Sequence, residues 1–311
     1  MSDAPAPSRH YEFAYSAPHQ ESGLVFNRIR ALKDIPLHDV KAGDLGGYVE
    51  SENNIEQGSN AWVAEMARVI GDARVSGDAL VSGKARVIDS AQVMGCARVG
   101  DSATVANSAV IKDRAKVSMN AFIGENACVY EDAQVSGDAA IRDSVNVFGQ
   151  AKVSATACIE GNARIYDKAF VYGCASISGH VHVHGHTTVR GSCVLSGFAH
   201  AYDHAIIEDS TRVKDHSLVF GNARISGHAI ISGNAAISSY RDYMHFGPFT
   251  DSNLWLTAHR DSKQTVRIAF WNFAGDLAEF EAYLARQQGF DQITRMNIAL
   301  FLEAARQTFR V

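Results

Sequence analysis

Histidine is the residue whose type and spacing in this chain most readily suggest chemistry. Eight of the 13 histidines lie between residues 180 and 228. They are His180, His182, His184, His186, His200, His204, His216 and His228. Imidazole is a common general base near neutral pH and a common metal ligand. The cluster therefore marks this part of the chain as the first place to look for a functional site.

Ring side chains recur through the same region at intervals of 18 residues. This column consists of Tyr130, Phe148, Tyr166, His184, Tyr202 and Phe220. A second column lies two positions earlier and consists of Cys128, Asn146, Arg164, His182, His200 and Leu218. If one structural turn takes 18 residues, each column becomes a stripe of stacked side chains. The two stripes would then share one outward surface, with His182 and His200 adjacent.

Both columns belong to a six-residue rhythm that runs without insertion from Ala61 to Ser238. Every sixth residue from Val63 to Ile237 is Val, Ile or Leu in 29 of 30 cases, with Ala201 the exception. The residue two places earlier is Ala in 24 of 30 cases. A unit this short can bury its apolar side only by stacking on its neighbours. The rhythm therefore predicts a β-solenoid.

Turn-forming residues mark the corners between the predicted strands. Glycine or a short polar residue often stands two places after the large apolar residue, as at Gly71, Gly77 and Asp89. Such residues accept the sharp bends and positive φ angles of corners. The order of aliphatic, variable and small residues resembles the hexapeptide-repeat family. That resemblance implies a left-handed parallel β-helix with three hexads per coil, and hence about ten coils.

The segments before the repeat predict a flexible start over residues 1–20 and an irregular N-terminal cap over residues 21–60. The β-helix itself is expected over residues 61–239. The run LGGYVE from Leu45 to Glu50, followed by hexads, resembles the YdcK-like and prophage-encoded hexapeptide-repeat proteins. Members of that group are named as transferases from their repeats.

Residues 240–311 predict a small C-terminal ββαα domain that closes the helix and contributes to oligomerisation. Residues 254–259 and 266–273 alternate as the two strands of a hairpin. Asp276 and Glu279 have the spacing of a capping box at the start of a helix. The apolar face of that first helix is expected to contain Leu277, Phe280 and Leu284, and that of the second Ile293, Met296, Leu300 and Phe301.

Composition narrows the class of partner. The net charge of −5, without a long run of either sign, gives no basis for sequence-independent nucleic-acid binding. No signal peptide or membrane span is recognisable, so no membrane partner is expected. The five cysteines form no CxxC pair and no secreted disulfide framework, which favours a reducing, cytoplasmic setting. Cys193 occupies an interior alanine position and is expected to be buried.

The ring column has three interpretations. Outward aromatic stripes often mark contact surfaces, and hexapeptide-repeat proteins are commonly trimers, so the first is a homo-oligomer interface. The second is cross-strand stacking that stabilises the sheet. The third is a platform on which a planar ligand such as a nucleotide base would stack. The expected ligand or interface residues are Tyr130, Phe148, Arg164, Tyr166, His184, Tyr202 and Phe220.

The histidines divide into corner residues and residues on the flat surface. His182, His184 and His200 share the flat surface and are the catalytic candidates. In the trimeric acyltransferases that the fold resembles, a cleft histidine is the general base and acyl-CoA is the cofactor. The carbonic anhydrases of this fold need a three-histidine zinc site whose motif is missing here. No metal is therefore predicted.

The sequence thus favours a non-catalytic solenoid that self-associates, with a trimer preferred, and binds a small molecule or a host protein. A phage or prophage role, sequestering a host factor or a nucleotide-like signal, is one hypothesis for that binding. No cofactor is expected on this interpretation. The alternative is an acyl-CoA-dependent acyltransferase that uses a cleft histidine.

Overall fold

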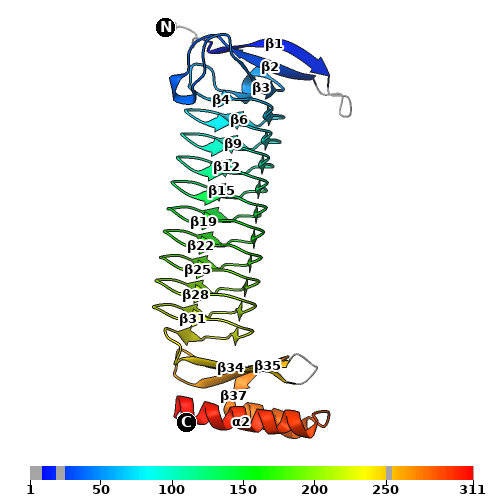
Figure 1. Ribbon diagram of the computed structural model, residues 1–311, viewed down its shortest axis with the longest axis vertical. Coiled ribbons are helices and arrows are strands. Elements are labelled where there is room, and N and C mark those ends of the chain that lie inside the picture. Colours follow the sequence, from blue (N-terminus) through cyan, green and yellow to red (C-terminus); the bar gives the residue numbers. More distant parts are fainter. Residues whose placement is uncertain (1–8, 19–24, 250–253, 311) are drawn as a thin grey trace, which may run out of the picture. The chain divides into compact units, whose positions relative to one another are not determined.

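The computed structural model describes residues 9–18, 25–249 and 254–310. These residues form two compact units, the first ending at Gly161 and the second beginning at Asn162. Thirty two-residue strands, from β4 (Trp62–Val63) to β33 (Ala236–Ile237), recur every six residues, as the sequence predicts. Within each unit the successive coils lie on one another (Figure 1). The predicted parallel β-solenoid is confirmed.

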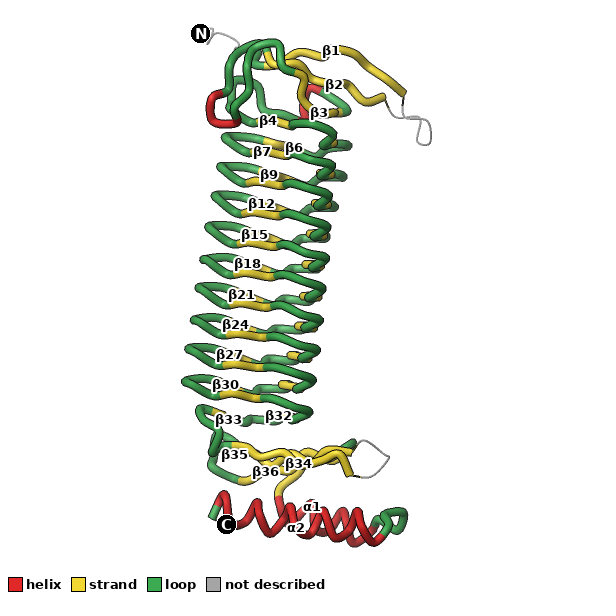
Figure 2. Tube along the Cα trace, viewed as in Figure 1, coloured by secondary structure: helices red, strands yellow, loops and turns green. Residues whose placement is uncertain are grey.

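In the first unit the short strands form three parallel stacks, seen as short strand segments in Figure 2. The first contains β5 (Arg68–Val69), β8 (Arg86–Val87), β11 (Thr104–Val105), β14 (Phe122–Ile123), β17 (Ala140–Ile141) and β20 (Cys158–Ile159). The second contains β4, β7 (Leu80–Val81), β10 (Arg98–Val99), β13 (Lys116–Val117), β16 (Gln134–Val135) and β19 (Lys152–Val153). The third contains β6 (Arg74–Val75), β9 (Gln92–Val93), β12 (Val110–Ile111), β15 (Cys128–Val129) and β18 (Asn146–Val147).

The second unit repeats the arrangement. One stack contains β23 (Ser176–Ile177), β26 (Val194–Leu195), β29 (Arg212–Val213) and β32 (Ile230–Ile231). Another contains β22 (Phe170–Val171), β25 (Thr188–Val189), β28 (Ile206–Ile207) and β31 (Arg224–Ile225). The third contains β21 (Arg164–Ile165), β24 (His182–Val183), β27 (His200–Ala201), β30 (Leu218–Val219) and β33.

The core of the coils consists of the predicted aliphatic and small residues, which are buried throughout the repeat. Cys193 is buried among them, as expected, and its thiol lies 2.8 Å from the Arg190 carbonyl oxygen. Corner residues adopt positive φ, for example Gly83 at 68° and Asp101 at 55°. The Asp101 carboxylate accepts a 2.9 Å hydrogen bond from the backbone N–H of Met119, one coil further on. Corner carboxylates thus satisfy backbone donors that the short strands leave unpaired.

The N-terminal segment differs from its prediction. Residues expected to be flexible form strand β1 (Tyr11–Pro18), which pairs antiparallel with β2 (Val25–Ala31). Tyr11 is buried and donates a 3.1 Å hydrogen bond to the Glu52 carbonyl oxygen, which explains why this strand is ordered without an apolar period. Residues 1–8 and 19–20 of the predicted flexible start lie outside the described residues.

Parallel pairing begins before the first hexad. Strand β3 (Leu45–Val49) pairs antiparallel with β2 and parallel with β5, with Val49 opposite Val69. Two short 3-10 helices, η1 (Pro36–His38) and η2 (Glu52–Asn54), lie on either side of β3 in the sequence. After η2, Ile55 forms a parallel bridge with Val75. The cap segment therefore already supplies strands to two of the stacks.

The C-terminal domain contains more strand than predicted. The expected hairpin corresponds to β35 (Leu254–Arg260) and β36 (Val266–Phe270), and it is flanked by β34 (Tyr243–Phe249) and β37 (Phe273–Asp276). Helices α1 (Leu277–Arg286) and α2 (Gln292–Phe309) follow, and the predicted capping box at Asp276 is present. The Ile230 backbone N–H donates a 2.9 Å hydrogen bond to the Thr257 hydroxyl, which ties this domain to the last coils.

The apolar face predicted for α2 is only partly the buried one. Phe301 is buried, together with Ile298 and Leu302. Three of the predicted core residues are instead exposed, Ile293 by 59%, Met296 by 56% and Leu300 by 58%. The helix therefore has apolar side chains on two sides, and the sequence pattern alone does not show which side meets the β-sheet.

Candidate functional site: a ring-rich surface

The predicted ring column is confirmed within the second unit. Tyr166 and His184 stack with ring centroids 4.6 Å apart and planes 4° from parallel. His184 and Tyr202 are 5.4 Å apart, and Tyr202 and Phe220 are 5.2 Å apart, again nearly parallel. Each ring follows a buried aliphatic residue and repeats at the spacing of the parallel strands, which explains the even stacking. All four rings are half-buried.

Two further members of that column form a pair in the first unit. Tyr130 and Phe148 stack at 4.9 Å with planes 4° from parallel. The ammonium group of Lys112 lies 5.0 Å from the centre of the Tyr130 ring, a cation–π contact. Column stacking is therefore present in both units, but the histidines adjoin it only in the second.

Two of the three candidate histidines lie side by side on neighbouring strands. The pairing of β24 with β27 puts His182 opposite His200, and their ring centroids are 4.6 Å apart at 37°. The Tyr166 ring meets His182 edge-on at 6.3 Å. On the other side of His182, Arg164 is its register partner on β21, as predicted from the second column.

The surroundings keep these two imidazoles neutral. Burial, followed by the positive charges that His200 and Arg164 can carry, lowers the pKa of His182 below its usual 6.5. Burial, followed by the neighbouring His184, lowers the pKa of His200 in the same way. The third candidate, His184, lies in the ring column, and its Nδ1 is 3.7 Å from an Asp167 carboxylate oxygen. At neutral pH His182 and His200 therefore present uncharged rings.

The corner histidines form stacks of their own, which the sequence analysis did not anticipate. Phe198 lies between His180 and His216, with ring centroids 4.9 Å and 5.0 Å away and nearly parallel planes. On the other side of the strands, His186 stacks on His204 at 5.0 Å. These residues also repeat every 18 residues. The spacing that predicts the two columns would therefore have predicted these stacks as well, if it had been applied to the corner positions.

Together these residues define a ring-rich surface on strands β21, β24, β27 and β30. Its members are Tyr166, His182, His184, His200, Tyr202 and Phe220, flanked by the corner stacks. Within the column, the faces of His184 and Tyr202 are covered by neighbouring rings, so their edges are what remains for contact. The rings therefore stack along the sheet and leave a row of ring edges for contact.

A charged cluster beside β25 was not found from the sequence. Glu208 is buried, and its carboxylate accepts a 2.9 Å hydrogen bond from Arg190 Nε and another from Arg224 Nε. Burial opposes its ionisation, but the two guanidinium groups outweigh that cost, and the pKa of Glu208 lies below its usual value. A carboxylate held ionised between two arginines is a structural group rather than a proton acceptor.

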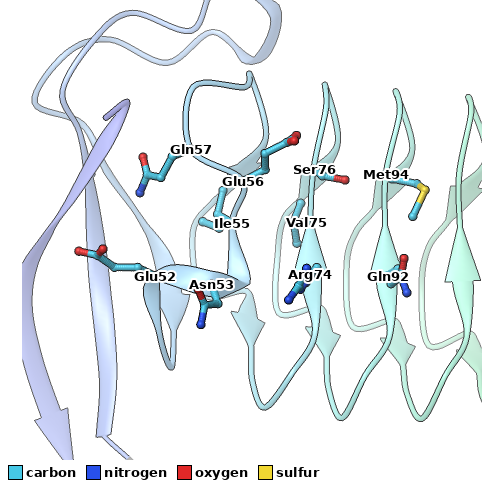
Figure 3. A pocket seen from close by; sticks show the side chains of 10 residues that line it. All are labelled: Glu52, Asn53, Ile55, Glu56, Gln57, Arg74, Val75, Ser76, Gln92 and Met94. Atoms are coloured by element: carbon cyan, nitrogen blue, oxygen red, sulfur yellow. The ribbon is translucent and has the colours of Figure 1, made fainter. Parts of the chain in front are cut away.

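Two hollows are lined by other residues. One, of about 440 Å³, lies in the first unit between η2 and strands β6 and β9 (Figure 3). The other, of about 410 Å³, lies between β37 and α1 and includes Tyr283 and Arg286. Neither is lined by a residue of the ring-rich surface. In the described part of the chain, no three His, Cys, Asp or Glu side chains converge closely enough to hold a metal ion.

Comparison with known proteins does not assign the chain to a family. No protein-family model matches the sequence, and no curated protein matches it either. The chain is thus defined by its architecture, a parallel β-solenoid with a C-terminal α+β domain. Among the helices described, none is long and apolar enough to span a membrane.

Proposed function

We propose that the protein is a non-catalytic β-solenoid that self-associates through its ring-rich surface, forming a trimer of the kind that the hexapeptide-repeat resemblance implies. The observation that carries this proposal is the unbroken stack from Tyr166 to Phe220, with the neutral pair His182 and His200 beside it. Flat strands hold these rings in fixed positions before any contact forms. Association then costs little side-chain entropy.

The geometry favours a protein surface over a planar ligand as the occupant. A nucleotide base would need an open ring face, whereas the faces of His184 and Tyr202 are already covered by their neighbours. Ring edges suit the edge-to-face contacts that aromatic side chains of another chain can make. Uncharged imidazoles add to this, because burying them in an interface carries no charge desolvation cost. A second copy of the chain can supply aromatic side chains and uncharged imidazoles of this kind.

The test is the subunit number of Tyr202→Ala, measured by native mass spectrometry at neutral pH. We expect the wild-type protein to be a trimer and the variant to dissociate at least tenfold more readily. Tyr172→Ala is the matched control, because Tyr172 also follows a buried aliphatic residue but lies beside β22, in a different stack. A Tyr202→Ala protein that stays folded and keeps its subunit number would contradict the proposal.

The apolar stripe on α2 provides a second check on the location of the interface. Ile293, Met296 and Leu300 are more than half exposed and lie on one side of the helix. If Leu300→Gln dissociates the oligomer and Tyr202→Ala does not, the C-terminal domain rather than the ring-rich surface holds the subunits together. If Tyr202→Ala alone does so, the ring-rich surface is the interface.

An acyl-CoA-dependent acyltransferase is the second candidate, favoured by one observation. His182 and His200 are partly accessible and have lowered pKa values, so both are in the neutral form that a general base requires. If this candidate is correct, native mass spectrometry of protein purified from its own host should detect bound CoA. His182→Ala or His200→Ala should then reduce turnover with acetyl-CoA at least a hundredfold without changing the subunit number. The scaffold proposal expects no turnover in any of these proteins.

A further inference from the structure

The hollow between η2 and strands β6 and β9 is set in a rigid frame. Asn54 is buried, and its side-chain oxygen accepts hydrogen bonds from the backbone N–H groups of Ser51 at 2.7 Å and Glu50 at 3.0 Å. Its side-chain nitrogen donates to the carbonyl oxygens of Gly71 at 2.9 Å and Ala73 at 2.8 Å. All hydrogen-bonding positions of this amide are thereby used. The short helix that forms one wall is fixed to the coil before any ligand arrives.

One side of the hollow consists of three planar polar side chains. Asn53, Arg74 and Gln92 lie in one row, as Figure 3 shows. Among the described residues, no hydrogen bond or ion pair engages these three side chains. A guanidinium group presents paired donors that match the two oxygens of a carboxylate. The neighbouring amides add donors on either side of it.

The opposite side carries negative charge. Glu56, Ser76 and Met94 form a second row in Figure 3. The Glu56 carboxylate is held by a 2.9 Å hydrogen bond from the backbone N–H of Gly77, which leaves its other oxygen available. Glu52 lies at the end of the hollow, where its carboxylate pairs with Arg9 at 3.3 Å. A simple anion would be repelled from this side, and a simple cation would be repelled by Arg74.

The spacing between the rows sets the length of a ligand that satisfies both. Arg74 begins β6 and Ser76 directly follows that strand, two residues further on, so the rows are separated by about 7 Å. An extended chain of two amino acids spans about the same distance. A hollow of about 440 Å³ accommodates a molecule of this size.

We propose that this hollow binds a small zwitterion about two residues long, such as a dipeptide, with its carboxylate on Arg74 and its ammonium group on Glu56. Asn53 and Gln92 would hydrogen-bond the carboxylate and the peptide group. Ser76 and Met94, which lie in the same row as Glu56, would contact the ammonium end of the molecule. This site uses no residue of the ring-rich surface, so it does not depend on the proposed self-association.

The experiment is calorimetric titration of the full-length protein with three related probes. They are alanyl-alanine, its N-acetylated form, which has only the carboxylate, and its C-terminal amide, which has only the ammonium group. We expect alanyl-alanine to bind at least tenfold more tightly than either blocked form. Equal affinity for the three, or no binding of alanyl-alanine at millimolar concentration, would overturn the proposal.

Two variants assign the ends of the ligand. Arg74→Gln should abolish the preference for alanyl-alanine over its amide, and Glu56→Gln should abolish the preference over the N-acetylated form. Glutamine at position 56 can still accept the hydrogen bond from Gly77, so the frame is retained. Arg86→Gln is the matched control, because Arg86 has the same position in its hexad but lies on β8, in another stack. Binding that is unchanged in Arg74→Gln would also overturn the proposal.

Discussion

Replacing Gly46 with alanine is expected to detach the N-terminal cap from the first coils. A Cβ atom at this position would lie 2.6 Å from Ile29 Cγ1, 2.6 Å from the Val63 carbonyl oxygen and 2.7 Å from Trp62 Cζ2. Ile29 and Trp62 are buried, and the carbonyl oxygen belongs to the backbone, so none of the three can move freely. Overpacking of a rigid core costs about 3 kcal/mol when the neighbours cannot give way.

Hydrogen exchange is the appropriate measurement for Gly46→Ala, because a solenoid can lose one end while the rest stays folded. The amides of β1, β2 and β3 should exchange about a hundredfold faster than in the wild type, which corresponds to about 3 kcal/mol. Gly100→Ala is the control, since its added Cβ would meet only the Ser82 hydroxyl, at 3.4 Å. Unchanged protection of β1 to β3 in Gly46→Ala would show that the cap tolerates the methyl group.

Acidification is expected to destabilise the C-terminal domain through His259. This side chain is fully buried, and its Nε2 lies 3.5 Å from the Ser232 backbone nitrogen of the last coils. Burial lowers the pKa of His259 to about 4, with a smaller contribution from Arg267, against the opposing effects of the Arg260 carbonyl and Asp261. The neutral imidazole is therefore the form that fits the folded protein.

The sign of the pH effect follows from this lowered pKa. An unfolded chain binds a proton on this histidine near pH 6.5, whereas the folded protein does so only near pH 4. The stability contributed by neutral His259 is thus fully present above pH 6.5 and is lost as the pH falls toward 4. The difference between the two pKa values corresponds to about 3 kcal/mol.

Urea unfolding at pH 7 and at pH 4.5 can isolate this contribution. Wild-type protein should lose more stability between the two pH values than His259→Gln, because glutamine can replace both hydrogen bonds but does not titrate. The comparison removes the effects of other histidines with lowered pKa values, such as His10 and His245, since both proteins contain them. Equal losses in the two proteins would show that His259 does not contribute to the acid sensitivity.

The repeat was predictable because its physics is local and periodic. Each hexad contributes one large and one small buried residue, and 30 repetitions leave few other ways to bury them. The same period predicted the stack from Tyr166 to Phe220 and the adjacency of His182 and His200. Side chains one coil apart must meet when strands stack in parallel register, whatever their type.

The cap was less predictable because its order depends on distant partners. Tyr11–Pro18 has no apolar period, yet it forms β1 because Tyr11 reaches the Glu52 carbonyl oxygen and β2 offers a free edge. Helix α2 has two apolar sides, and only packing against the sheet determines which of them is buried. Ile298 and Phe301 are buried, whereas Leu300 is exposed. A helical pattern indicates that apolar sides exist but not which of them meets a partner.

The amino-acid sequence by itself determined the period, the buried aliphatic and alanine positions, the corners and the columns of rings, because these follow from neighbours at fixed spacing. Only the tertiary structure decided the state of the side chains within that frame. It sets the lowered pKa values of His182, His200 and His259, the enclosure of Glu208 by two arginines and the hollow around Arg74. Burial, charge and free volume at a given atom depend on every segment packed around it, and those segments come from distant parts of the chain.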